Sequence, residues 1–252
     1  MMVRLKYLIV QLIVLLGIFN VNCGRTDPTA NNDISVPTLQ PLSVFNLNIS
    51  EPSGIAYNSK NNTLMIVSDG NSDIFETDLS GNVLRTIPTT SSDMEGITLT
   101  KNCDTIFVVE ETNRLVTSYL ESAVRLNSFS VDVAAAPNHA LEGITRNNAN
   151  GHLFVINEKQ PCMLLEFEGT NELWRKELKY TSDVSDVYFE APSSSFWIVS
   201  DESKKILKLS YNTNLIGEWM IPVQQEEGIT IVNDKIYIVS DLESKLYVFQ
   251  KP

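Results

Sequence analysis

Carboxylate side chains recur at two fixed positions along this sequence. The first position directly precedes a glycine and holds Glu95, Glu142 and Glu227. The second position ends a short apolar run and holds Asp69, Glu111, Glu158, Asp201 and Asp241. Carboxylate oxygens are hard ligands, which suit Ca²⁺ or Mg²⁺ better than Zn²⁺. If the fold brings the two positions together, the pattern predicts a divalent-cation site, with Ca²⁺ as the expected ion.

The glutamates that precede glycine are the expected direct ligands, and three acids of the second position are secondary candidates. The direct ligands are Glu95, Glu142 and Glu227, and the secondary candidates are Glu111, Glu158 and Asp241. A structural role is the alternative, because an aspartate at a strand end often accepts backbone N–H bonds from the next turn.

The acids belong to a phrase that occurs five times. Its plainest copy is Glu227-Gly228-Ile229-Thr230, followed by Ile236 to Asp241. The glycine position falls at residues 54, 96, 143, 186 and 228, with steps of 42, 47, 43 and 42 residues. In the fourth copy, Ser185-Asp186 replaces the Glu-Gly pair. A fixed period of this size indicates a repeat architecture.

Each repeat contains four short runs rich in β-branched and aromatic residues, without a sustained helical period. Four strands per repeat of this length predict the blade of a β-propeller, so we expect an all-β fold with five blades. The fifth copy lacks a fourth strand, and the strand expected at Val44–Ile49 would complete it and close the ring. Six blades are the alternative, but the extra blade would have to lie within residues 125–140, which is too short a stretch.

Three phrases of the sequence resemble those of the SdiA-regulated (YjiK-like) family of bacterial envelope proteins. These phrases are Glu51 to Tyr57, Asp93 to Ile97 and Leu141 to Ile144. The resemblance covers about residues 41 to 252 and implies a β-propeller in the cell envelope. It implies no established reaction, and the Ser185-Asp186 departure argues against a strict ring of equivalent glutamates.

Two classes of function fit these patterns. The first is a propeller without catalytic activity that binds a ligand or an envelope protein at an acidic face. The second is a metal-dependent hydrolase of lactonase or phosphoesterase type, for which only the fold offers an analogy. Standard catalytic motifs are absent, and the chain has two histidines. His139 could act as a base beside a metal, but its loop position is more typical of a solvated side chain. The scarcity of histidine favours the binding protein, and the sequence predicts no catalytic residue.

The N-terminus predicts export. Residues 1–22 have a basic start and an apolar run that is shorter than the ~20 residues of a membrane-spanning helix, as expected for a signal peptide. The run ends at Cys23, which resembles the lipidated cysteine of a bacterial lipoprotein; ordinary secretion is the alternative. Residues 23–40 form the expected flexible tether, and residues 41–252 form the propeller domain. We therefore expect a cell-envelope location, either as an outer-membrane lipoprotein or as a secreted or periplasmic protein.

Charge and cysteine content limit the partners. Without the basic residues of the signal, 17 basic side chains face 31 acidic ones, a net charge of −14. This charge disfavours nucleic acid and anionic lipid, so the expected membrane contact is the lipid anchor alone, and the protein is expected to be a monomer. Cys103 and Cys162 are expected on opposite faces of the propeller and therefore unpaired.

Overall fold

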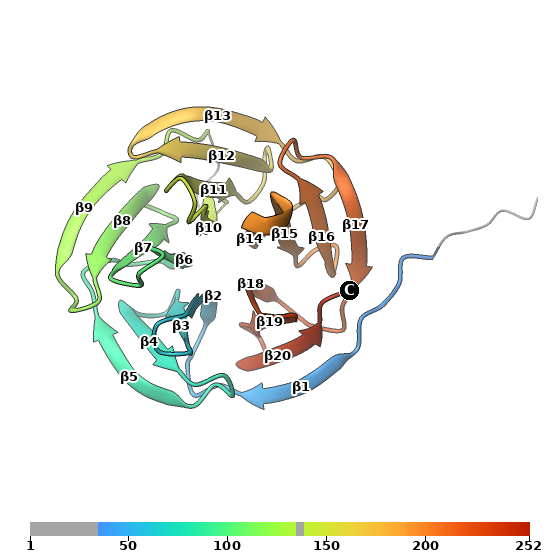
Figure 1. The fold of residues 1–252 in the computed structure, drawn as a ribbon, viewed down its shortest axis with the longest axis horizontal. Helices are drawn as coiled ribbons and strands as arrows, with labels where there is room; N and C mark the ends of the chain where they lie inside the picture. Colours follow the sequence, from blue (N-terminus) through green and yellow to red (C-terminus); the bar gives the residue numbers. More distant parts are fainter. Residues whose placement is uncertain (1–34, 135–138) are drawn as a thin grey trace, which may run out of the picture. The chain divides into compact units, whose positions relative to one another are not determined.

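The computed structural model describes residues 35–134 and 139–252. Residues 36–252 form one compact unit built from twenty described strands in five sheets of four, and the predicted five-bladed β-propeller is therefore confirmed. Figure 1 shows the sheets arranged around a centre, with β2, β6, β10, β14 and β18 innermost. No helix within the described ranges is long and apolar enough to cross a membrane. Cys23 and the signal peptide lie outside the described residues.

Each of the first four blades is a run of consecutive antiparallel strands. Blade 1 contains β2 (Pro52–Asn58), β3 (Thr63–Ser68), β4 (Asp73–Thr77) and β5 (Val83–Pro88). Blade 2 contains β6 (Met94–Leu99), β7 (Thr105–Glu110), β8 (Leu115–Leu120) and β9 (Arg125–Ser130). Blade 3 contains β10 (Leu141–Arg146), β11 (Leu153–Asn157), β12 (Met163–Glu168) and β13 (Asn171–Glu177). Blade 4 contains β14 (Asp186–Glu190), the short 3₁₀ helix η1 (Ala191–Ser193), β15 (Ser195–Ser200), β16 (Lys205–Ser210) and β17 (Leu215–Met220).

The fifth blade joins the two ends of the propeller. It contains β18 (Glu226–Val232), β19 (Lys235–Ser240), β20 (Lys245–Gln250) and β1 (Pro41–Asn46). β1 pairs antiparallel with β20, with Phe45 opposite Leu246. The closure is as predicted, but the expected strand at Val44–Ile49 is wrong by three residues. Leu47 and Ile49 lie beyond the strand and are buried in the core between blades 5 and 1, which explains why their apolar character resembled a strand continuation.

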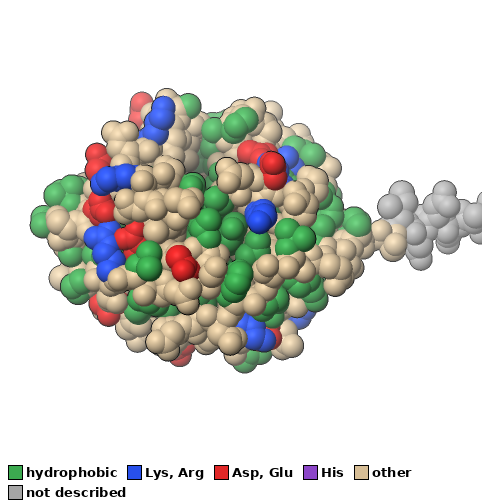
Figure 2. Space-filling model, turned by 60° about the horizontal axis from the view of Figure 1, so that its bottom comes forward, with side chains coloured by type: hydrophobic (Ala, Val, Ile, Leu, Met, Phe, Trp, Pro, Cys, Tyr) green, Lys and Arg blue, Asp and Glu red, His purple; other side chains and the backbone are tan. Residues whose placement is uncertain are grey.

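The hydrophobic core is divided among the five junctions between neighbouring blades. The second strands of blades 1, 3 and 4, which are β3, β11 and β15, are buried along their whole length. The fourth strands are mostly exposed and carry apolar side chains such as Leu84, Leu126 and Ile216 on the outside of the ring. On the face shown in Figure 2, hydrophobic side chains accordingly lie between scattered acidic and basic ones. Cys103 and Cys162 are buried and unpaired, as predicted.

Candidate functional site

The inner strands begin around a cavity of about 260 Å³, which we call the acidic mouth. Eleven of its lining residues are acidic: Glu51, Asp69, Glu95, Glu111, Glu142, Glu158, Asp183, Asp201, Glu202, Glu227 and Asp241. Ser53, His139, Lys159 and Ser185 complete the lining. All six residues predicted as cation ligands therefore lie in one cavity, and both acidic positions of the repeat contribute to it.

Glycine allows the inner strands to approach closely enough to form this mouth. A Cβ atom on Gly54 would lie 2.6 Å from the carbonyl oxygen of Glu95, and one on Gly96 would lie 2.8 Å from the Cα atom of Gly143. Contacts this short are not tolerated between a Cβ atom and rigid backbone, so each glycine makes room for the next blade. The residue that precedes each glycine is thereby held at the channel.

A local irregularity of the sheet directs the first acidic position towards the cavity. In blades 2 and 5 the register between the first two strands shifts at the glycine: Met94 lies opposite Glu110 and Gly96 opposite Val109, while Glu226 lies opposite Ser240 and Gly228 opposite Val239. Glu95 and Glu227 are thus the extra residues of β-bulges, and a bulge changes the direction of a side chain. Blades 1 and 3 have register shifts at the same place.

The second acidic position is fixed by its backbone. In blades 1, 2 and 5 its N–H donates to the carbonyl oxygen of the residue three before the glycine, which has a positive φ angle. The bonds are Asp69 to Glu51 (3.1 Å), Glu111 to Asp93 (3.0 Å) and Asp241 to Gln225 (3.0 Å). Because these bonds involve only main-chain groups, they do not occupy the carboxylate oxygens at the strand ends.

The three predicted direct ligands lie close to other carboxylates and lack compensating donors. Among the residues described, no side chain or backbone group donates a hydrogen bond to the carboxylate of Glu95, Glu142 or Glu227, and no basic side chain forms an ion pair with any of the three. Burial, and then neighbouring negative charges, raise the pKa of Glu95 and of Glu142 well above the usual range. The same causes raise the pKa of Glu227 to about 8. A cation in the mouth would relieve both effects.

Two groups of three acids have suitable spacing for a metal ion. One consists of Asp69, Asp93 and Glu95, and the other of Glu111, Glu142 and Glu158; in each, one oxygen from every residue lies within 4.8 Å of the others. Oxygens bound on opposite sides of Ca²⁺ at ~2.4 Å would be ~4.8 Å apart, so the spacing is compatible with a shared ion. Glu227 and Asp241 line the cavity outside both groups. Asp93 was not among the predicted ligands.

Positive charge reaches the mouth mainly on one side. Lys159 Nζ lies 2.6 Å from Glu158 and 3.2 Å from Glu202, and His139 Nδ1 lies 2.9 Å from the other oxygen of Glu158. Asp201 accepts from the N–H of Gln225 at 3.0 Å and pairs with Lys204 at 3.2 Å. The structural interpretation therefore accounts for Asp201. On the side of blades 1 and 2, Glu111 accepts a hydrogen bond from the N–H of Ala140 at 3.1 Å, but no basic side chain among the described residues pairs with Asp69, Glu95 or Glu111.

The fourth blade departs from the pattern for a structural reason. Asp186 stands in the glycine position, is fully buried, and accepts a hydrogen bond from the N–H of Ile229 at 2.8 Å. It therefore connects blade 4 to blade 5, and its position opposite Gly143 requires that residue to remain a glycine. The neighbouring position in the mouth is Ser185, which supplies no charge.

Glu226 is a buried acid that the sequence pattern did not distinguish from its neighbour. Its side chain is inaccessible to solvent, and neither carboxylate oxygen has a hydrogen-bond partner among the described residues. Burial raises its pKa to about 9. The corresponding residues of blades 2 and 3, Met94 and Leu141, are apolar core residues. The bulge explains the difference, because it directs Glu227 into the mouth and Glu226 into the core.

Comparison with known proteins gives a family and a fold. A family model described as SdiA-regulated matches residues 40–250. Among solved structures, a chain of a nidogen/laminin complex superposes with a TM-score of 0.60 at 16% identity, covering 79% of this chain and 76% of that one. Virginiamycin B lyase from Staphylococcus aureus superposes with a TM-score of 0.51 at 16% identity, covering 79% and 66%. At this identity the two structures show a shared fold alone.

Proposed function

The chain belongs to the SdiA-regulated family, and from that premise we propose that it is a non-enzymatic binding protein whose acidic mouth takes up a divalent cation, preferentially Ca²⁺. The observation that carries the proposal is the convergence of Glu95, Glu142 and Glu227 on one cavity without counter-charges of their own. Uncompensated carboxylates at this density destabilise a fold, and a bound cation removes that cost.

The donor set supports Ca²⁺ over softer metals. The mouth offers many carboxylate oxygens and one imidazole, and no cysteine lines it among the described residues. Ca²⁺ accepts six to eight oxygen ligands in flexible geometry, whereas Mg²⁺ requires a near-ideal octahedron. A mouth contributed by five separate blades fits the flexible arrangement better. Ser53 and Ser185 leave part of the mouth uncharged, where a ligand or partner can reach the ion.

The proposed setting is the cell envelope. Export through residues 1–22 and lipidation at Cys23 would place the propeller on a tether outside the cytoplasm, where free Ca²⁺ is more abundant. The net charge of −14 after removal of the signal supports a soluble monomer that avoids nucleic acid. The partner is proposed to be an envelope protein or a small ligand that binds at the acidic mouth.

A metal-dependent hydrolase is the second candidate, and the contact between His139 and Glu158 favours it. His139 Nδ1 lies 2.9 Å from a Glu158 oxygen, and both residues line the mouth. A carboxylate in this position orients an imidazole to act as a general base for a water molecule bound at the cation. Screening lactones and phosphoesters with Ca²⁺ present tests this candidate: turnover that is lost in His139→Ala supports it, and no turnover with either class rejects it.

Cation binding is tested by thermal unfolding and titration calorimetry. A ligand that binds only the folded state raises stability by about 2.7 kcal/mol at a hundredfold excess over Kd. Added Ca²⁺ should therefore raise the Tm of the wild type, EDTA should lower it, and the double variant Glu95→Gln/Glu142→Gln should respond to neither. The control is Glu168→Gln/Glu177→Gln, which removes two exposed charges from the outer strands of blade 3. If neither EDTA nor millimolar Ca²⁺ changes the Tm of the wild type, the acids do not bind the cation and have a structural role.

A further inference from the structure

A cavity that is separate from the acidic mouth lies between blades 2 and 3. It measures about 160 Å³, and we call it the side cavity. Figure 1 shows that the two blades are neighbours in the ring, with β9 and β13 on the outside. Most of the lining surface is apolar and comes from Phe107, Val116, Phe129 and Leu153. Phe107 and Phe129 are only partly buried, so both rings can contact a molecule in the cavity.

Three other junctions between blades are filled by an apolar residue from the turn that follows a third strand. Leu79 packs on the core between blades 5 and 1, Ala123 on the core between blades 1 and 2, and Tyr211 on the core between blades 3 and 4. Blade 3 has a shorter turn at this place, formed by Gly169 and Thr170. A Cβ atom on Gly169 would have no other atom within 4 Å. The side cavity is therefore the space that a turn side chain fills elsewhere.

Arg146 supplies the polar end of the side cavity. It is the last residue of β10 and lies three residues after the glycine position. The other blades carry aromatic or aliphatic side chains there, which are Tyr57, Leu99, Phe189 and Ile231. A Cβ atom on Gly151 would lie 2.9 Å from Nη2 of Arg146, and Gly151 lines the side cavity but not the channel. Nη2 therefore lies at the wall of the side cavity, although Arg146 also reaches the end of the channel opposite the acidic mouth.

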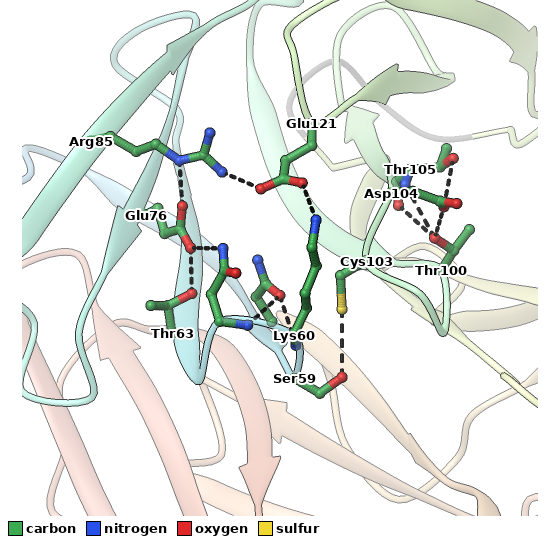
Figure 3. Close-up of polar contacts among 12 residues, drawn as sticks. Ser59, Lys60, Thr63, Glu76, Arg85, Thr100, Cys103, Asp104, Thr105 and Glu121 are labelled. Carbon is green, nitrogen blue, oxygen red and sulfur yellow. Dashed lines mark hydrogen bonds and ion pairs between the residues drawn. The ribbon is translucent and has the colours of Figure 1, made fainter.

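The guanidinium of Arg146 has unused donors. Nη1 donates to Oδ1 of Asn148 at 2.6 Å, whereas Nη2 and Nε have no hydrogen-bond partner among the described residues. Asp104 is the one described carboxylate whose charge acts on Arg146, and Figure 3 shows it held by the hydroxyls of Thr100 and Thr105, at 2.6 and 3.2 Å. Burial lowers the pKa of Arg146, as expected for a partly desolvated cation. Nε and Nη2 lie on one edge of the planar group, so together they can donate to both oxygens of a carboxylate.

The size and chemistry of the side cavity suit a single aromatic ring that carries an anionic group. A cavity of about 150 Å³ lined by aliphatic and aromatic side chains can hold one benzene molecule. Phe107 and Phe129 can pack against a third ring, and contacts between aromatic rings add to the free energy gained from burial. Arg146 offers two donors to an anion and repels an ammonium group. The exposed residues Asn127 and Thr170 mark the entrance, so a ligand can reach the cavity from solvent.

We propose that the side cavity is a second binding site, which takes a small aromatic carboxylate with its ring against Phe107 and Phe129 and its carboxylate on Arg146. The apolar walls remove the ring from water, and the free edge of the guanidinium replaces the hydration of the carboxylate. No residue of the acidic mouth lines the side cavity, so this proposal is independent of cation binding there.

The test is an NMR titration of the ¹⁵N-labelled full chain with benzoate, in EDTA so that benzoate cannot bind through a cation in the acidic mouth. The amide signals of Gly151 and Gly169 should shift, while those of Gly54 and Gly96 beside the acidic mouth should not. Acetate, benzylammonium and inorganic phosphate lack the ring, the carboxylate or both, and each should bind at least about tenfold more weakly than benzoate. Cyclohexanecarboxylate, whose ring is not aromatic, should bind severalfold more weakly.

Two variants test the two ends of the site. Arg146→Leu introduces the residue type that blade 2 carries at this position, so the fold should tolerate it, and it should weaken benzoate binding at least about tenfold. Ser118→Leu fills part of the cavity from β8 and should weaken benzoate binding to a similar extent. The control is Arg125→Leu, which removes an exposed arginine of β9 that does not line the cavity and should bind benzoate as the wild type does.

The shifts of Gly151 and Gly169 are measured on the wild type, so the test does not depend on the folding of a variant. The proposal is overturned if benzoate at tens of millimolar does not shift these two signals. It is also overturned if benzylammonium or cyclohexanecarboxylate binds as tightly as benzoate, or if folded Arg146→Leu retains full affinity.

Discussion

Carboxylates at the two ends of the channel have pKa values shifted in opposite directions. At the acidic mouth, burial and like charges raise the pKa of Glu227 to about 8 and that of Asp69 to about 6. On the opposite face of the propeller, where the inner strands end and which we call the lower face, burial also raises the pKa of Glu190, but bonds from Lys251, Ser193 and Lys208 outweigh this effect and lower the pKa to about 2. Glu190, at the end of the inner strand β14, is therefore paired with cations, whereas Glu95, Glu142 and Glu227 at the opposite end of the inner strands have no counter-charges.

The difference shows which acids stabilise the fold and which are available for binding. A carboxylate with a lowered pKa contributes stability at neutral pH, whereas one with a raised pKa reduces it. Glu202 is an exception within the acidic mouth, because Ser182 and Lys159 hold its pKa below the usual value. It lies on the same side as Lys159, so the uncompensated charge is concentrated around Glu95, Glu142 and Glu227.

The largest effect is expected from the glycines that bring the inner strands together. A Cβ atom on Gly96 would lie 2.8 Å from backbone atoms of Glu142, Gly143 and Ile144. Because backbone cannot move aside within a closed ring, Gly96→Val should lower the free energy of unfolding by at least about 3 kcal/mol and disturb the acidic mouth. Urea unfolding followed by circular dichroism measures this.

Gly70→Ala is the matched control for Gly96→Val. Its added Cβ would meet the flexible end of the Glu51 side chain, which can move away, so its stability should change by less than about 1 kcal/mol. Equal urea midpoints for Gly96→Val and the wild type would show that the inner strands are not held by these glycine contacts.

The spacing of these glycines was also the feature from which the fold could be predicted. The period of the glycine position gave the number of blades, and the acids placed relative to it gave the composition of the acidic mouth. Both are periodic features, and a propeller converts a sequence period directly into a ring of equivalent positions. The closing strand was placed three residues too late because Leu47 and Ile49 are buried for a different reason, the core between blades.

Other features depend on local backbone geometry that residue types do not reveal. Neither the bulge that separates Glu226 from Glu227 nor the positive φ angle of Asp93 has a signal in the repeat. Asp186 was recognised as a departure, but its bond to Ile229 depends on where the next blade lies. The cavity at the lower end of the channel, with Lys101 and Arg146 in its lining, was not predicted, because these cations occupy different positions in single blades and not a repeated position.

The second-largest effect is the pH dependence of stability that the raised pKa values of the acidic mouth produce. The pKa of Glu227 is about 8 in the folded state against an ordinary value of 4.5, so between these values the folded state binds more protons than the unfolded chain. The free energy of unfolding of the metal-free protein should therefore fall as the pH rises from 5 to 8, by on the order of 2 kcal/mol. Denaturant titrations in EDTA at several pH values measure the slope.

The triple variant Glu95→Gln, Glu142→Gln, Glu227→Gln should remove most of this pH dependence. Saturating Ca²⁺ should also reduce it in the wild type, because a bound cation stabilises the charged carboxylates. Constant or increasing stability of the metal-free wild type between pH 5 and 8 would contradict the assignment of raised pKa values to the acidic mouth.

A smaller gain is expected from Glu226, the acid that lies behind the mouth and not in it. Its buried carboxylate has no hydrogen-bond partner among the described residues, and the corresponding residue of blade 2 is Met94. Glu226→Met should therefore raise the free energy of unfolding by about 1–2 kcal/mol at pH 8 without changing Ca²⁺ affinity. Glu226→Gln keeps a buried polar group and should gain less. If Glu226→Met abolished Ca²⁺ binding, Glu226 would belong to the site.

The smallest effect is expected at the paired acids of the lower face. Figure 3 shows Glu121 between Lys60 and Arg85 of the neighbouring blade, at 3.0 and 2.6 Å. The bond from Lys60 is the main cause of its lowered pKa, so its contribution is present above pH 4.5 and is lost as the pH falls below that value. Because both cations are largely exposed, Glu121→Gln should cost less than about 1 kcal/mol at pH 7, and high salt should reduce the cost further. Glu168→Gln, which removes an exposed acid of the same face, should cost nothing measurable. A stabilising effect of Glu121→Gln would show that carboxylates at the two ends of the channel do not differ in the way their pKa values indicate.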